Sequence, residues 1–75
     1  MKIAYYRDTD SLYIDLADRS SAETREISEG VNLDYDEQGV VVGIDIDLAS
    51  QKLDLQTVIL DNFPRETRFL QTLHK

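Results

Sequence analysis

Apolar and polar residues alternate over most of the first 48 positions, a pattern typical of β-strands. The clearest alternation runs from Val40 to Leu48, where every even position is apolar. The shorter alternating segments are 2–6, 12–16 and 31–35. Residues 23–27 combine acidic and basic side chains with little apolar content, so we expect a solvated strand at an edge of the sheet.

Two turns are expected to fold these strands into hairpins. A turn at residues 8–11 would place Tyr5 opposite Ile14 and Tyr6 opposite Tyr13 on the outer surface. Residues 36–39 match a type I turn, with an aspartate at the first position and a glycine at the last. This second register would put Asp34 opposite Val41. Both loops have an even length, so the apolar positions of all paired strands share one face, which something must cover.

Beyond the strands, the chain changes character. Residues 49–53 suit one helical turn, and the β-branched segment 57–60 is expected to be extended. Asn62, Phe63 and Pro64 resemble a helix entry, which predicts a helix over residues 64–73. A helix of this length is marginal alone, so it must dock on its own sheet or on a partner.

We therefore predict one α+β domain, an antiparallel meander of four to five strands with a short C-terminal helix. Its strand-rich body would span residues 1–62, and a basic helical tail would span residues 63–75. The full chain of 75 residues has a net charge of −7. Because the tail carries three basic residues and one acidic residue, the negative charge lies in the body.

Composition excludes several classes of protein. The chain has no cysteine, so disulfides, thiolate zinc sites and cysteine nucleophiles are excluded. An acidic body repels phosphate backbones, so nucleic acid is not an expected partner. No apolar run approaches the roughly 20 residues of a membrane span, and no signal peptide is evident. We expect a cytoplasmic protein without a membrane partner.

Two groups of residues resemble a known family. They are Asp10-Ser11-Leu12-Tyr13-Ile14 and, after the Asp34-Tyr35-Asp36 turn, Val42-Gly43-Ile44-Asp45. Together with the flanking strands they make residues 1–53 similar to the bacterial domain-of-unknown-function family 2283. The resemblance implies a small β-rich module with no established enzymatic activity. Some members lie beside suspected toxins and are themselves suspected antitoxins.

Candidate chemistry is sparse. The segment from Asp34 to Asp45 overlays an EF-hand calcium loop, but apolar Val42 stands at a ligand position and strands flank the loop. We interpret it as a solvated hairpin. The single histidine, His74, has no second ligand or triad partner nearby in sequence. The sequence therefore predicts no metal, no cofactor and no enzyme, because no base, nucleophile and orienting group converge.

Interaction surfaces are the better candidates. Two tyrosines on the outer face, Tyr6 and Tyr13, exceed what a solvated sheet needs and suit a contact with a subunit or partner, unless they merely cover each other. The tail offers a second surface, which could occupy a partner's groove, reach a second copy or cover its own sheet. Its candidate residues are Arg65, Arg68, Phe69, Leu70 and Leu73.

These observations favour a non-enzymatic interaction or structural module. A chain of this size buries little apolar surface, so a homo-oligomer, with a dimer favoured, is expected. The alternative is an antitoxin-like regulator that binds a basic protein through charge complementarity. Nothing in the sequence identifies that partner.

Overall fold

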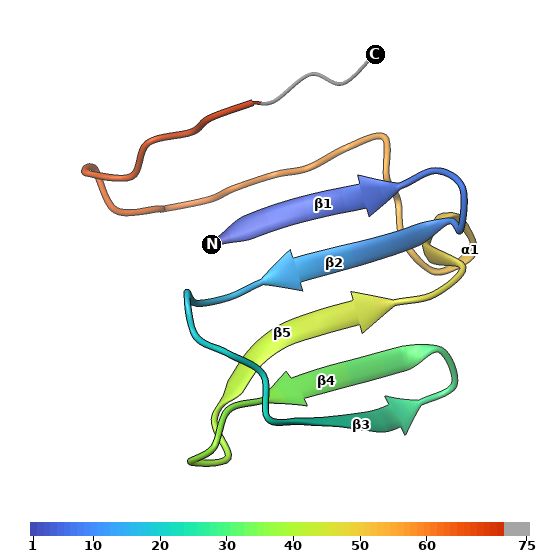
Figure 1. Cartoon of the computed structure of the whole chain (residues 1–75). Helices are drawn as coiled ribbons and strands as arrows, with labels where there is room; N and C mark the ends of the chain where they lie inside the picture. The colour runs from blue at the N-terminus through green and yellow to red at the C-terminus, as the bar shows by residue number, and fades with distance from the viewer. Residues whose placement is uncertain (72–75) are drawn as a thin grey trace.

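The computed structural model describes residues 1–71, which form one antiparallel sheet and one short helix (Figure 1). Five strands lie in the order β1-β2-β5-β4-β3. Their bounds are Lys2–Tyr6 (β1), Ser11–Asp15 (β2), Glu23–Ser28 (β3), Val31–Tyr35 (β4) and Val41–Ile46 (β5), and the helix α1 spans Ala49–Lys52. The strands expected from the alternation are thus all present. The fold is mostly β, because its helix has four residues.

The first hairpin turns one residue earlier than predicted. Asp10 donates its backbone N–H to Arg7 at 3.3 Å and adopts a positive φ of 53°, so the turn occupies residues 7–10. Tyr5 therefore lies opposite Leu12 rather than opposite Ile14. The loop keeps its even length, so the expected face is unchanged although the predicted partners were wrong.

The second hairpin turns where the sequence indicated. Gly39 donates its backbone N–H to Asp36 across 3.0 Å and has a φ of 82°, a conformation that favours glycine. A bulge then shifts the register. Asp34 lies opposite Gly43, whereas Tyr35 lies opposite Val41. The predicted pairing of Asp34 with Val41 was wrong, because the alternation does not reveal an inserted strand residue.

The strand order departs from the predicted meander. β5 lies between β2 and β4, and β3 forms the far edge. The order β2-β5-β4-β3 is that of a Greek key, with a long connection joining β2 to β3. The composition of two strands agrees with their places in this order. β5 is the most apolar strand and takes the central position, whereas all six residues of β3 are exposed at an edge, as the charge pattern predicted.

The predicted C-terminal helix is absent from the described part of its range, residues 64–71. A single turn forms there, with the backbone N–H of Thr67 donating to the carbonyl of Pro64 at 3.0 Å. The chain after α1 runs back past β1 without joining the sheet (Figure 1). A helix of about ten residues is marginal unless its apolar side packs against another element. Here Phe69 and Leu70 are 64% and 84% exposed, so no such packing stabilises a helix.

The helix α1 closes the end of the sheet. Its Ala49 is fully buried, and the backbone N–H of Ala49 donates to the carbonyl of Asp10 at 2.8 Å. Leu53 ends the helix in an extended conformation. This one-turn element ties the chain after β5 to the first hairpin.

Candidate functional site

One face of the sheet is apolar across four adjacent strands. The register places Ile14 beside Ile44 in the two central strands, and Leu33 of β4 follows on the other side of Ile44. We call this set the apolar face; its members on β1, β2, β5 and β4 are Ile3, Tyr5, Leu12, Ile14, Ile44, Ile46, Val31 and Leu33. The face predicted from the even loops is therefore present.

The apolar face is poorly covered. Ile3 is 53% exposed and Tyr5 is 42% exposed, and the remaining members are only partly buried. Among the described residues, the buried hydrophobic side chains are Val42 and Ala49. A sheet with one apolar face normally packs that face against a second layer. Residues 1–71 supply no second sheet and no helix longer than four residues to cover this face, although Arg68 and Leu70 of the tail line a hollow beside β1.

The opposite face, which we call the outer face, is organised around a tyrosine. Tyr13 crosses above Gly43 and donates its hydroxyl to Asp34 Oδ2 at 2.6 Å. Thr24 donates its hydroxyl to the other oxygen, Oδ1, at 2.5 Å. The hydrogen bond to Asp34, together with burial, raises the pKa of Tyr13 to about 12. Side chains from three strands are thus joined across β5.

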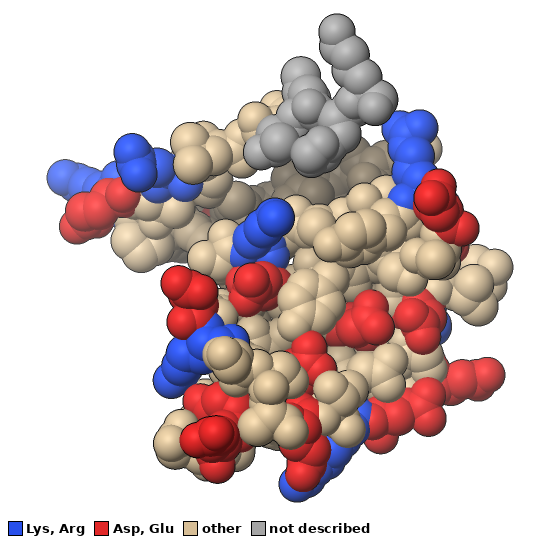
Figure 2. All heavy atoms as spheres, in the orientation of Figure 1, with Lys and Arg blue, Asp and Glu red and all other residues tan. Residues whose placement is uncertain are grey.

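Acidic side chains crowd this outer face. Asp45 lies directly opposite both Tyr13 and Asn32 in the register. Burial and then the nearby charges of Asp47 and Asp34 raise the pKa of the Asp45 carboxyl. Figure 2 shows the acidic side chains gathered over the lower half of the molecule, where β5, β4 and β3 lie. The structure therefore brings acids closer together than the predicted register implied.

The two outer-face tyrosines differ in their surroundings. Tyr6 is 54% exposed and lies opposite Ser11, whereas Tyr13 is partly buried and lies opposite Ala4. The predicted direct pairing of Tyr6 with Tyr13 was wrong, because the first turn ends at Asp10. A role for either ring in binding a partner stays a prediction.

The tail residues singled out in the sequence are exposed where the structure describes them. Phe69 is 64% exposed and Leu70 is 84% exposed, and Arg65 and Arg68 are exposed as well. The turn after Pro64 brings the Phe69 ring to 6.3 Å from the ring of Phe63, measured between centroids. Leu73 and His74 lie outside the described residues.

Asp10 forms a clasp that the sequence did not indicate. Its Oδ1 accepts hydrogen bonds from the Tyr5 hydroxyl at 2.8 Å and from the Ser50 backbone N–H at 3.0 Å, and its Oδ2 accepts the Ser50 hydroxyl at 2.6 Å. The hydrogen bonds from Ser50 and then Tyr5 lower the pKa of Asp10. Forty positions separate Asp10 from Ser50, so no local pattern could reveal the contact.

The carboxylates of the segment that overlays an EF-hand loop, from Asp34 to Asp45, make separate contacts and do not converge. Asp36 is buried, and its Oδ1 accepts the backbone N–H groups of Gln38 and Val40, each at 2.9 Å. Its Oδ2 lies 3.7 Å from Arg19 Nη1. Asp34 instead accepts hydroxyl groups on the outer face. Within residues 1–71, no three acidic or histidine side chains gather into a metal-binding group.

Comparison with known proteins gives a family match over the part of the chain that forms the sheet. A family model described as a protein of unknown function, DUF2283, matches residues 2–50. The chain belongs to the DUF2283 family. The match spans the five strands and the first two residues of α1, so the DUF2283 region is the sheet without the tail. The searches of curated proteins and of solved structures each gave no match.

The DUF2283 chain presents two surfaces of contrasting character. One is the apolar face, and the other is the acidic outer face. No helix within the described residues is long and apolar enough to cross a membrane. The hydroxyl groups of Tyr13, Tyr5, Thr24 and Ser50 all donate to carboxylates, so these groups are engaged in holding the fold.

Proposed function

We propose that this DUF2283 chain is a non-enzymatic interaction module that acts as a homo-oligomer, with a dimer as the basic unit, in the cytoplasm. The observation that carries the proposal is the uncovered apolar face. A second copy of the chain is a natural partner for this face, because it is present wherever the chain itself is present. Covering this face would supply the second layer that a sheet of this kind needs.

The exposed area supports association. The chain has 6657 Å² of accessible surface, whereas a compact monomer of this mass keeps roughly 4,700 Å². The difference is about 2,000 Å², shared between the apolar face and the extended tail. A standard interface buries about 800 Å² from each partner. The excess is larger than the area that a standard interface buries on one partner, with the exposed tail contributing part of it.

A non-enzymatic role is supported by the hydrogen bonds in which the polar side chains of the fold are engaged. Catalysis needs a base or nucleophile that is free to react and an orienting group beside it. Two of the polar clusters in the described chain, around Asp34 and around Asp10, pair each carboxylate with hydroxyl groups that stabilise the fold.

Sedimentation equilibrium on the purified full chain tests self-association. We expect a mass of twice 8.6 kDa at micromolar concentrations and dissociation only on dilution or in denaturant. A mass of one chain at every concentration would overturn the proposal.

The crowded acids favour a second candidate function, an antitoxin-like regulator that binds a basic protein on the outer face. Burial is the larger cause of the raised pKa of Asp45, and the nearby charges of Asp47 and Asp34 add to it; a cationic partner would relieve this repulsion. Capture from a host lysate at low and at moderate salt tests this candidate. An Asp34→Asn and Asp45→Asn double variant is the matched control. Equal retention by both forms, or failure to retain any basic protein, would count against it.

A further inference from the structure

On the four adjacent strands β1, β2, β5 and β4, the apolar face carries no charged residue. Among the strand residues, charges on this side of the sheet lie on the edge strand β3, where Glu23 lies opposite Tyr35 and Arg25 lies opposite Leu33. These two side chains form an ion pair with each other. Arg25 also lies 5.0 Å from the centre of the Tyr35 ring. The charges of β3 on this side are therefore already compensated within the chain. Outside the strands, the carboxylate of Asp10 lies beside this face, hydrogen-bonded to Tyr5.

The outer face would not accept a second copy as readily. The register places one acidic residue of each of four strands on this face. They are Asp15 on β2, Asp45 on β5, Asp34 on β4 and Glu26 on β3. Two such faces brought together would place like charges against each other, which costs several kcal/mol. In a chain of net charge −7, the apolar face is the surface on which two copies can meet without repulsion.

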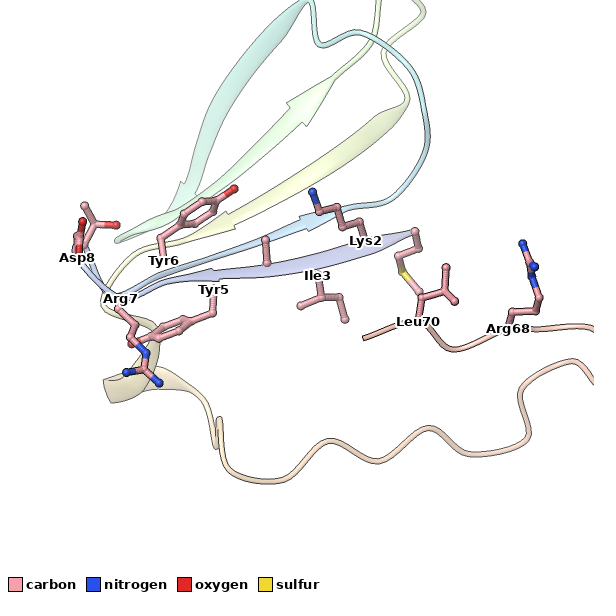
Figure 3. Close-up of a pocket in the computed structure, with 11 residues that line it drawn as sticks. Lys2, Ile3, Tyr5, Tyr6, Arg7, Asp8, Arg68 and Leu70 are labelled. Atoms are coloured by element: carbon pink, nitrogen blue, oxygen red, sulfur yellow. The ribbon is translucent and has the colours of Figure 1, made fainter. Parts of the chain in front are cut away.

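The two edges of the sheet also differ. β3 is protected by its charges and by a register shift between Glu26 and Ser28. β1 has an open hollow beside it, with a volume of about 1100 Å³, lined by residues 1–9 together with Arg68 and Leu70. Figure 3 shows that Ile3 and Tyr5 point to the side on which the tail runs, while Lys2 and Tyr6 point to the other.

We propose that two copies pack apolar face against apolar face, as the two layers of a β-sandwich related by a two-fold axis. This inference rests on the proposed function, since it names the surface through which the chain self-associates. Sheets packed in this way lie roughly 10 Å apart and interdigitate their side chains. Ile14 and Ile44 lie at the middle of the interface, and the margin of the partner's sheet enters the hollow beside β1.

Single cysteine variants of the full chain test the surface directly, because the natural sequence has none. Ile14→Cys and Ile44→Cys place a thiol in the middle of the apolar face. Asp45→Cys is the matched control, because it is the next residue of the same strand and lies on the outer face. Under mild oxidation, we expect the first two variants, alone or mixed, to convert to covalent dimers. The control should stay uncross-linked.

A charge variant gives a second readout. Ile44→Asp would bury a carboxylate in the interface, so we expect loss of the dimer mass in sedimentation. Asn32→Asp adds the same charge on the outer face and should leave the mass unchanged. If Ile44→Asp does not fold, the cross-linking result decides the question.

The outcomes separate the two proposals. A natural chain that is dimeric, but whose Ile14→Cys and Ile44→Cys forms cross-link no more than Asp45→Cys, overturns the sandwich and leaves self-association intact. A natural chain that is monomeric overturns both.

Discussion

The hydroxyl of Tyr13 reaches Asp34 by passing over Gly43, so three adjacent strands are joined by one side chain. Asp34 and Gly43 lie directly opposite each other in the register. A Cβ atom at Gly43 would lie 2.7 Å from Tyr13 Cζ and closer still to its hydroxyl oxygen. Gly43 is therefore required for the approach of a ring, which is one of the established uses of glycine within a strand.

Gly43→Ala should destabilise the fold. The added methyl group forces the rigid Tyr13 ring aside and breaks its hydrogen bond to Asp34, and overpacking of this kind costs roughly 1–3 kcal/mol. Urea unfolding at fixed protein concentration measures the loss. In a Tyr13→Ala background the same substitution should cost less, because the obstructing ring is gone. An equal cost in both backgrounds would contradict the proposed steric cause.

Tyr13 should also make stability fall in strong alkali. Its pKa is about 12 in the folded chain and 10.0 in a model peptide, so the folded state holds this proton more tightly. The contribution is complete below about pH 10 and is lost as the pH rises toward 12. Unfolding free energies measured across this range should decline less steeply for Tyr13→Phe. Tyr5, whose pKa its hydrogen bond to Asp10 also raises, accounts for a remaining slope.

Asp10 should give the opposite dependence in acid. Hydrogen bonds from Ser50 and Tyr5 lower its pKa below the ordinary value of 3.8, so its contribution is present above that value and is lost as the pH falls through the lowered pKa. Asp10→Asn is the informative variant, because asparagine tolerates the positive φ at this position. We expect a lower melting temperature near neutral pH and a smaller further decrease in acid. Ser50→Ala should reproduce part of this change.

The carboxylate of Asp36 should matter for stability through its hydrogen bonds to the second turn. Asp36→Ala removes the acceptor of two backbone N–H groups in the second turn, and a hydrogen bond to a charged group is worth roughly 1.5–3 kcal/mol. Asp36→Asn keeps an oxygen at the same place and should recover most of the loss. Urea unfolding of the two variants makes the comparison. A similar loss in both would point instead to the 3.7 Å ion pair with Arg19.

The strands were predictable because alternation with a period of two is a local signal. It located β4 and β5 and assigned the apolar positions to one face. In the first hairpin the parity of the loop survives a shift of the turn by one residue, and in the second a one-residue bulge restores the shared face. The register between paired strands was harder to predict from the sequence. The bulge between Asp34 and Tyr35 leaves the alternation of apolar and polar residues unchanged, so that pattern does not reveal it. Asp10, which ends the first turn, is held by Ser50 forty positions away.

Strand order and side-chain networks needed the structure. Charge placed β3 at an edge, but nothing local indicated that β5 would lie against β2. Gly43 within a strong strand pattern was the available signal for the Tyr13 to Asp34 contact, because a glycine there implies a close approach. The helix expected near Pro64 was wrong because a pattern of three apolar residues indicates a stripe but not a surface that receives it.

Removal of the tail should leave the sheet folded. The hydrogen bonds that segment 54–71 makes within the described chain stay inside the segment, and Val58 and Ile59 are 73% and 80% exposed. A chain ending at Leu53 should therefore keep its far-ultraviolet circular dichroism spectrum. If two apolar faces form the dimer, it should also keep twice the mass of the shortened chain in sedimentation. Unfolding on truncation would mean that the tail covers its own sheet, whereas a folded monomer would mean that the tail is exchanged between copies.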